Sequence, residues 1–137
     1  MAESPPNPPQ ASDPPRSGDV GADFRFLGEY HLRRPADFAR VYDRKCSVAD
    51  GRMVVYACRN ELEHPRVGFS VSRKVGGAVV RNRCRRLFRE AFRLERGNLP
   101  QHVDLVLIPR HGWHEGLANL RRSLVELARR AARKLER

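Results

Sequence analysis

The sequence predicts an α+β fold, in which helices pack on a small and mostly antiparallel sheet. Two runs, Arg52–Arg59 and Arg66–Ser72, alternate apolar with small or polar residues, which is the period of a half-buried strand. A third run, Val103–Ile108, is almost continuously apolar, as expected of an interior strand. The segments around these runs repeat their apolar residues at helical spacing. The expected order is therefore α-β-β-α-β-α, with a further short strand between Cys46 and Ala49.

The chain has 137 residues, which is enough for one domain with a modest core. Residues 1–22 are rich in proline, slightly acidic and without periodicity, so we expect a disordered tail there. Residues 23–137 are expected to form a single RNA-binding domain, for reasons that follow from their charge. No apolar run approaches the roughly 18 residues of a membrane span, and no signal peptide opens the chain. These features predict a soluble, cytoplasmic protein without a membrane partner.

The first helix is predicted to begin at Pro35, because proline suits the first helical position and Asp37 places negative charge in the first turn. Phe38, Val41 and Tyr42 share one face of this helix. Two interpretations stay open. Either all three residues anchor the core, or the two aromatic rings form a platform on which unpaired bases stack.

The two alternating strands follow this helix. In the first strand, Tyr56 shares one face with Val54 and Cys58. The polar connection of residues 60–65 is short, so we expect the two strands to be antiparallel neighbours. In the second strand, one face carries only small side chains, at Gly68, Ser70 and Ser72, so that other groups can approach the sheet closely there. This face either admits a polynucleotide backbone or lies beneath a packed helix.

A long helix is predicted from about Ala78, after the break at Gly76 and Gly77. Its expected apolar arc is Val80, Cys84, Leu87, Ala91 and Leu94, with Phe88 at the edge. Its opposite arc carries Arg81, Asn82, Arg85, Arg86, Arg89, Arg93 and Arg96. Ten basic and two acidic residues lie between Arg66 and Arg96, and this self-repelling charge predicts an anionic partner. The alternative is the ordinary solvated face of an amphipathic helix.

The last helix is predicted over Glu115–Arg137, after a turn at Gly97 and Asn98 and the interior strand. Its expected buried stripe is Leu117, Leu120, Leu124, Leu127, Ala131 and Leu135. We expect the arginines of this helix chiefly to form its solvent-exposed face. The three cysteines form no C-x-x-C pair, so neither a disulfide framework nor a zinc site is indicated.

The charge and the motifs favour binding over catalysis. The net charge is +11, and arginine, which supplies nearly all of the positive charge, is well suited to phosphate. We find no paired carboxylates, no Ser-His-Asp arrangement, no acidic cluster for Mg²⁺ and no nucleotide-binding loop. The sequence therefore predicts an RNA-binding protein with no catalytic residue, no metal site of its own and no small-molecule substrate.

The central stretch also carries a resemblance. The string Arg66-Val-Gly-Phe-Ser-Val-Ser-Arg-Lys74 is followed by Val75-Gly76, Val79-Val80, the triplet Arg81-Asn82-Arg83, Arg85-Arg86-Leu87 and Arg89-Glu90-Ala91-Phe92. This pattern resembles the signature of the protein subunit of bacterial ribonuclease P. The similarity extends from about Leu32 into the last helix.

The resemblance implies a fold like that of ribosomal protein S5 domain 2, and a role as subunit of an endoribonuclease. In that family a large catalytic RNA, with Mg²⁺, removes the 5′ leader of precursor tRNA, and the protein binds both RNAs. The residues that would face the catalytic RNA are Arg81, Asn82, Arg83, Arg85, Arg86 and Arg89. A cleft between the sheet and the first helix would hold the leader through Phe38, Tyr42, Tyr56, Arg66, Ser70, Ser72, Arg73 and Lys74.

The sequence departs from the family pattern at two positions. A glycine commonly follows the first helix, where this chain has Asp43-Arg44-Lys45, and Gly77 replaces a frequent asparagine. A non-catalytic ribosomal or RNA-assembly protein is the alternative function, since it would share the charge and the aromatic residues. A protein-only nuclease would need an acidic metal site, which the sequence does not offer.

Overall fold

The computed structural model describes residues 28–110 and 116–136. The elements, in chain order, are η1 (Gly28–Tyr30), α1 (Pro35–Arg44), β1 (Cys46–Ala49), β2 (Met53–Arg59), β3 (Arg66–Phe69), η2 (Arg73–Val75), α2 (Ala78–Glu95), η3 (Arg96–Asn98), β4 (Val103–Pro109) and α3 (Leu117–Leu135). The α+β class and the predicted order are confirmed, including the short strand β1. The tail predicted over residues 1–22 lies outside the described residues.

Helix α1 begins at Pro35 with Asp37 in its first turn, as predicted. It ends at Arg44. The next residue, Lys45, caps the helix: its backbone is left-handed (φ 58°), and its N–H donates to the Tyr42 carbonyl oxygen. Glycine adopts this conformation at lower cost than lysine does. The missing glycine after this helix is therefore accommodated by a lysine in the conformation that glycine would favour.

The four strands form one sheet in the order β1-β2-β4-β3. β1 and β4 both pair antiparallel with β2, and β3 pairs parallel with β4. The prediction that β2 and β3 are neighbours is therefore wrong, because β4 lies between them. Strand β4 takes this central place because its run of apolar residues can be covered on both faces. The β3-α2-β4 connection then makes β3 and β4 parallel.

The strand boundaries differ from the predicted ones at three ends. β2 begins at Met53 instead of Arg52. β3 ends at Phe69 instead of Ser72, although the Ser70 N–H still donates to the Leu107 carbonyl oxygen (3.0 Å). β4 includes Pro109, which is paired with Met53. Proline is tolerated there because it is the last residue of the strand.

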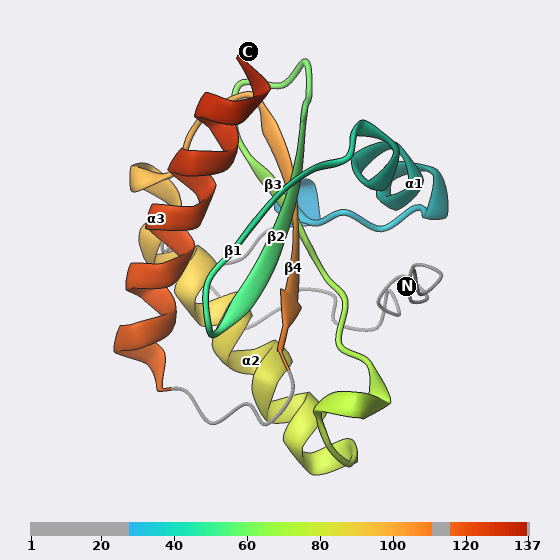
Figure 1. Ribbon diagram of the computed structural model, residues 1–137, viewed down its shortest axis with the longest axis vertical. Coiled ribbons are helices and arrows are strands. Elements are labelled where there is room, and N and C mark those ends of the chain that lie inside the picture. Colours follow the sequence, from blue (N-terminus) through green and yellow to red (C-terminus); the bar gives the residue numbers. More distant parts are fainter. Residues whose placement is uncertain (1–27, 111–115, 137) are drawn as a thin grey trace.

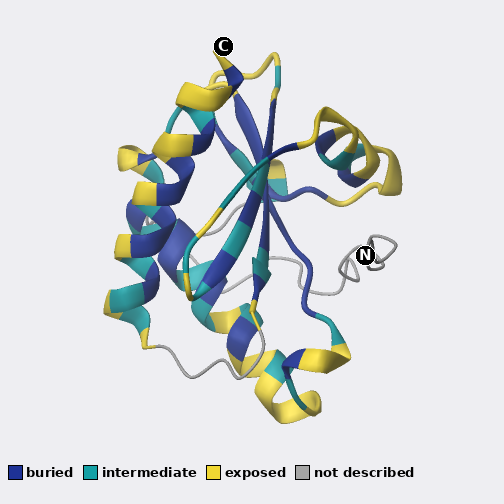
Figure 2. Ribbon diagram, in the orientation of Figure 1, coloured by how far each residue is buried: buried dark blue, intermediate teal, exposed yellow. Residues whose placement is uncertain are grey.

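Two unequal layers of helix cover the sheet (Figure 1). Helices α2 and α3 pack on one face over the main core, whose largest fully buried side chains include Phe69, Phe88, Phe92 and Leu124. Helix α1 covers part of the other face, over a small core of Leu32, Phe38, Val41, Cys58 and Val106. Figure 2 shows the buried sides of α2 and α3 turned toward the sheet and their exposed sides turned away.

The buried arc of α2 is rotated from the predicted one. Phe88 and Phe92 are buried, whereas Val80 is 39% exposed. The buried residues of the helix are Cys84, Phe88, Ala91, Phe92 and Glu95. The first turn of α2 extends past the sheet (Figure 1), and Val79 in that turn is 82% exposed.

Helix α3 confirms its predicted stripe, with Leu120, Leu124, Leu127, Ala131 and Leu135 buried and Leu117 half-buried. Its predicted first residues, before Gly116, lie outside the described residues. All three cysteines are buried free thiols. Burial raises the pKa of Cys84 to about 12, in keeping with its predicted role as a small apolar side chain.

Candidate nucleic-acid interface

The first half of α2 carries six residues that we call the basic ridge: Arg81, Asn82, Arg83, Arg85, Arg86 and Arg89. Asn82, Arg83 and Arg86 are exposed, and the other three are half-buried. Arg85 donates from Nη1 to the Asn82 Oδ1 (3.0 Å), which holds two neighbouring side chains of the ridge together. The structure thus brings all six predicted residues onto the outward side of one helix.

The two acids of α2 pair with arginines that lie outside the basic ridge. Arg93 donates to Glu90 (3.0 Å from Nε), and this hydrogen bond lowers the pKa of that carboxyl. Arg121 of α3 donates from Nε to Glu95 (2.6 Å). The ridge itself contains five arginines and no acid, so it presents a net positive charge to a polyanion.

On the other face of the sheet, two tyrosines meet where α1 ends. The Tyr42 and Tyr56 rings are 5.0 Å apart between centroids, at an interplanar angle of 70°. Both side chains are half-buried, and Ile108 and Val54 beside them on the sheet are half-buried too. We call Tyr42 and Tyr56 the tyrosine surface. Its rings offer area on which a nucleobase could stack, and the apolar side chains beneath them hold the rings in place.

Phe38, the third predicted aromatic, is only 3% exposed and belongs to the small core. Its ring lies directly over Gly68, where an added Cβ would come within 2.5 Å of the Phe38 Cζ. The small residue at Gly68 therefore makes room for α1. At this position the packed-helix interpretation holds, and the rings that a base could reach are those of Tyr42 and Tyr56.

Ser70 and Ser72 differ in their surroundings. Ser70 is 1% exposed and lies near Tyr42, whose pKa is raised by burial. The nearby Ser70 hydroxyl acts in the opposite direction and lowers the pKa of Tyr42. The Ser70 Oγ and the Tyr42 hydroxyl oxygen do not form a hydrogen bond of normal geometry. Ser72 is half-buried, and its Oγ accepts from the Lys74 N–H (3.2 Å), which caps η2. Arg73 and Lys74 are exposed on that turn.

Arg66 has a structural partner that the sequence analysis missed. Asp104 of β4 is fully buried, and Arg66 donates to both of its oxygens (2.9 Å from Nε and 2.7 Å from Nη2). Asn60 donates to the same carboxylate (2.7 Å), as does Arg40 of α1. The hydrogen bonds that Arg66 donates to Asp104 raise the pKa of Arg66. Arg66 thus ties β3 to β4, and only 20% of its side chain reaches solvent.

The sequence did contain a signal that Asp104 has a structural role, because it is a charged residue among the apolar residues of a strand. It alternates with Val103 and Leu105, so it points to the α1 face of the sheet, opposite the main core. A carboxylate there requires cationic partners. The sequence offers many arginines, so it could not identify which two would supply them.

The described residues contain no cluster of three or more His, Cys, Asp or Glu side chains that could hold a metal ion. Asp104, the most buried carboxylate, is already saturated by its hydrogen-bond donors, so its environment does not fit Mg²⁺. Within the same residues, no helix has the length and apolar character that crossing a bilayer requires. The arrangement is suited to binding phosphates on one side and bases on the other.

Comparisons with known proteins agree with this chemistry. A family model described as Ribonuclease P matches residues 26–132. A ribonuclease P protein component from Alkaliphilus metalliredigens is 40% identical over 84 residues, which are 61% of this chain and 76% of the relative. One from Exiguobacterium sibiricum is 43% identical over 84 residues, covering 61% of this chain and 72% of the relative.

Solved structures give the same result for the fold. The ribonuclease P protein of Thermotoga maritima superimposes with a TM-score of 0.67 at 31% identity, over 73% of this chain and 96% of the other. That of Staphylococcus aureus has a TM-score of 0.66 at 36% identity, over 74% and 94%. Both comparisons cover about three quarters of this chain and nearly all of the other.

Proposed function

This chain belongs to the family of ribonuclease P protein components, and from that premise we propose how it works within the endoribonuclease. The basic ridge of α2 binds the catalytic RNA, and the tyrosine surface binds the 5′ leader of precursor tRNA. The observation that carries this proposal is the ridge itself, whose five arginines share one helix with acids that are paired elsewhere.

The basic ridge supports binding to a folded RNA through its phosphates. Arginine donates two parallel hydrogen bonds to a phosphate, and its charge is not lost at any physiological pH. Contact with about five phosphates makes binding strongly salt-dependent. We expect a loss of roughly a hundredfold in affinity between 50 and 200 mM salt.

The tyrosine surface supports binding to an unpaired strand. Each base that stacks on Tyr42 or Tyr56 contributes about 1–3 kcal/mol, with little preference for sequence. Leaders differ in sequence from one precursor tRNA to another, so this tolerance suits them. Arg73 and Lys74 are exposed on η2 and would add positive charge near the leader phosphates.

In this proposal the phosphodiester is cleaved by the RNA partner with its own Mg²⁺. The protein supplies positive charge where two RNAs approach each other, which lowers the Mg²⁺ concentration needed for their association. Its residues bind and position the RNAs, and none of them is assigned a step in the cleavage.

The test is cleavage of a 5′-labelled precursor tRNA at low Mg²⁺, with the cognate catalytic RNA alone, the protein alone, or both. We expect efficient cleavage at the mature 5′ end only with both components. Cleavage by the protein alone would contradict the assignment of catalysis to the RNA. If the protein gave no stimulation, a role as a ribosomal or assembly protein would be favoured instead.

A further inference from the structure

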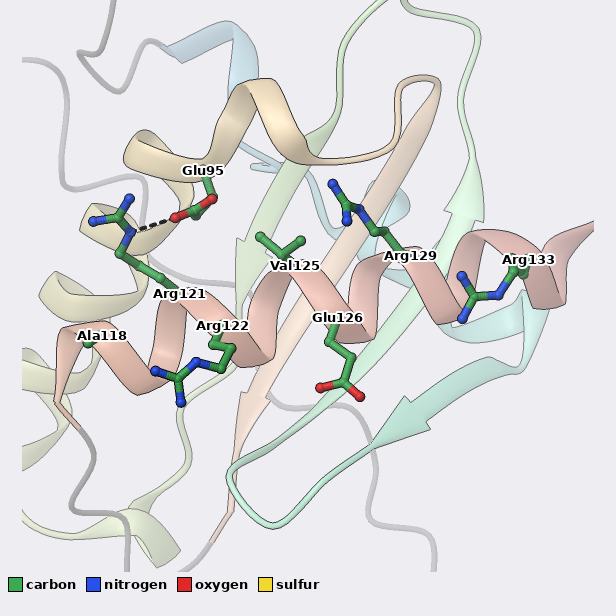
Figure 3. A pocket seen from close by; sticks show the side chains of 8 residues that line it. All are labelled: Glu95, Ala118, Arg121, Arg122, Val125, Glu126, Arg129 and Arg133. Carbon is green, nitrogen blue, oxygen red and sulfur yellow. Dashed lines mark hydrogen bonds and ion pairs between the residues drawn. The ribbon is translucent and has the colours of Figure 1, made fainter.

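A second basic region lies on α3, away from both surfaces of the proposed function. It is a groove of about 580 Å³ between α3 and the end of α2. Figure 3 shows four arginines along α3, with Arg121 turned toward Glu95. The residues that line the groove are Glu95, Ala118, Arg121, Arg122, Val125, Glu126, Arg129 and Arg133. We call it the α3 groove.

The α3 groove has an excess of positive charge. Four arginines line it against two glutamates. Glu95 is held by Arg121 (2.6 Å) and by the Asn98 amide (2.9 Å), so it is not available to repel an anion strongly. Of the arginines, Arg122, Arg129 and Arg133 are exposed. This charge lies on the face of α3 opposite its buried stripe, where packing does not require it.

The spacing of the exposed arginines fits a polymer better than a single ion. At a rise of about 1.5 Å per residue, Arg122 and Arg133 are about 16 Å apart along α3, with Arg129 between them. Between Arg122 and Arg129 the lining consists of Val125 and the exposed Glu126, so the row holds three arginines and one carboxylate. Such a row can contact several phosphates of one strand at once.

The composition of the groove favours paired over unpaired RNA. Among the described residues no aromatic side chain lines it, so this part of the chain offers no ring there on which an unpaired base could stack. Paired RNA is recognised mainly through its backbone and shape, which requires only suitably placed cations. The tyrosine surface, with the opposite composition, fits the unpaired leader.

The groove also borders the helix that carries the basic ridge. Arg121 is close enough to Glu90 of α2 to help lower the pKa of that carboxyl. α3 carries no exposed large apolar side chain among the described residues, so the groove has nothing to insert into a membrane. The groove therefore borders the C-terminal half of α2, whereas the basic ridge lies on the N-terminal half of the same helix.

We propose that the α3 groove is a second RNA-binding surface, which holds the phosphate backbone of a paired RNA segment. This inference rests on the proposed function only for the identity of the paired RNA, which would be a helix of the catalytic RNA. The groove extends the phosphate contacts of the basic ridge onto α3, and it does not contact the leader.

The experiment compares two triple variants of the full chain that remove equal charge. Arg122→Gln, Arg129→Gln and Arg133→Gln neutralise the groove, whereas the control neutralises three arginines that are exposed on the α1 side. The control variant carries Arg33→Gln, Arg34→Gln and Arg44→Gln. Circular dichroism checks that both variants are folded. The probes are the cognate catalytic RNA without precursor tRNA and a fully paired RNA hairpin, each titrated at several salt concentrations.

We expect the groove variant to bind both probes at least tenfold more weakly than the control at 150 mM salt. The slope of log affinity against log salt should fall by about 2–3, because roughly three phosphate contacts are lost. Equal binding by the two variants would overturn the inference. So would polyglutamate binding to the wild type as tightly as the hairpin, because the groove would then be a site for acidic peptides.

A positional readout separates this inference from the proposed function. All native cysteines are buried, so Arg129→Cys provides a single reactive thiol for an iron chelate that cleaves nearby RNA. We expect cuts in a paired segment of the catalytic RNA, and cuts confined to loops would overturn the inference. If the wild type fails to bind the catalytic RNA but binds the hairpin through the groove, the proposed function fails while this inference stands.

Discussion

The two faces of the sheet are covered by different kinds of side chain. The α2–α3 face is packed almost entirely with apolar side chains, and its largest members are fully buried. The α1 face has a small apolar core, a buried carboxylate held by two arginines, and two half-buried tyrosines at its open end. One face stabilises the fold and turns its charged helices outward, whereas the other keeps polar and aromatic groups close to the surface.

Under the proposed function, this difference explains how one small domain would bind two RNAs. Binding a folded RNA requires a rigid row of charges, and a well-packed helix such as α2 provides one. Binding a variable single strand requires rings that are supported but accessible, which a partly covered sheet face provides. The following predictions test whether the two faces are as different as their packing indicates.

The largest expected effect compares two buried phenylalanines, one on each face. Phe92→Ala should destabilise the protein by about 3–5 kcal/mol, because it opens a cavity in the main core. Phe38→Ala should fall at the lower end of that range, because its ring packs over Gly68 in a small core that can relax. Urea unfolding measures both values. A larger loss for Phe38→Ala would contradict the view that the α2–α3 face dominates stability.

Asp104→Asn tests the buried ion pairs of the α1 face. The change leaves Arg66 and Arg40 without their carboxylate, and breaking such a pair costs about 3–5 kcal/mol when it is fully buried. We expect about 3 kcal/mol here, since both arginines reach solvent. Precursor tRNA binding should weaken too, because Arg40 helps to dock α1. Asp43→Asn, on the exposed side of α1, is the matched control and should leave both measurements nearly unchanged.

Tyr42→Ala tests the tyrosine surface. Losing one stacked base should cost about 1–3 kcal/mol in the binding of precursor tRNA by the holoenzyme. Mature tRNA, which lacks the leader, should be bound as before. Tyr42→Phe keeps the ring and should retain most of the preference for the precursor. Equal losses for precursor and mature tRNA in Tyr42→Ala would rule out a leader contact at this residue.

The smallest expected effect concerns the link between α2 and α3. Burial acts to raise the pKa of Glu95, but hydrogen bonds from Asn98 and Arg121 outweigh it, so the pKa lies below the ordinary 4.5. A carboxyl with a lowered pKa stabilises the fold above pH 4.5, and that stability is lost as pH falls through the folded-state pKa. Glu95→Gln should therefore be less stable than wild type at pH 7, by about 1 kcal/mol or less.

That difference between Glu95→Gln and wild type should be smaller at pH 3 than at pH 7, because more of the wild-type carboxyl is protonated at the lower pH. Urea unfolding at the two pH values measures it. Glu126→Gln removes the same charge from an exposed position on α3 and serves as the control. A difference that grew at low pH would have the wrong sign for this ion pair.

Local features of the fold were predictable from the sequence, whereas strand pairing was not. Hydrophobic period and helix-end signals located each helix and strand to within a few residues, from Pro35 at the start of α1 to the stripe of α3. The error in strand neighbours arose because β4 inserts between β2 and β3, a choice made by contacts far apart in the chain. Periodicity describes one segment at a time, so it holds no information on which strands pair.

The rotated arc of α2 has a similar cause. Burial along this helix depends on α3 and on the edge of the sheet, so Val80 is left partly exposed and Glu95 is buried beside Arg121. At the candidate site, the basic ridge could be predicted because it lies on one helix. The Arg66–Asp104 pair could not, because it joins residues that are 38 positions apart.

The central claim is that the basic ridge and the tyrosine surface bind different RNAs, and a crossed binding experiment tests it most directly. One variant carries Arg81→Ala and Arg85→Ala, and the other carries Tyr42→Ala. Each variant is titrated with the catalytic RNA. The holoenzyme assembled with each variant is then titrated with precursor tRNA and with mature tRNA. The ridge variant should lose affinity for the catalytic RNA, whereas the tyrosine variant should lose only its preference for precursor over mature tRNA. If both variants lost both properties in equal measure, the two surfaces would be one site and the account would be wrong.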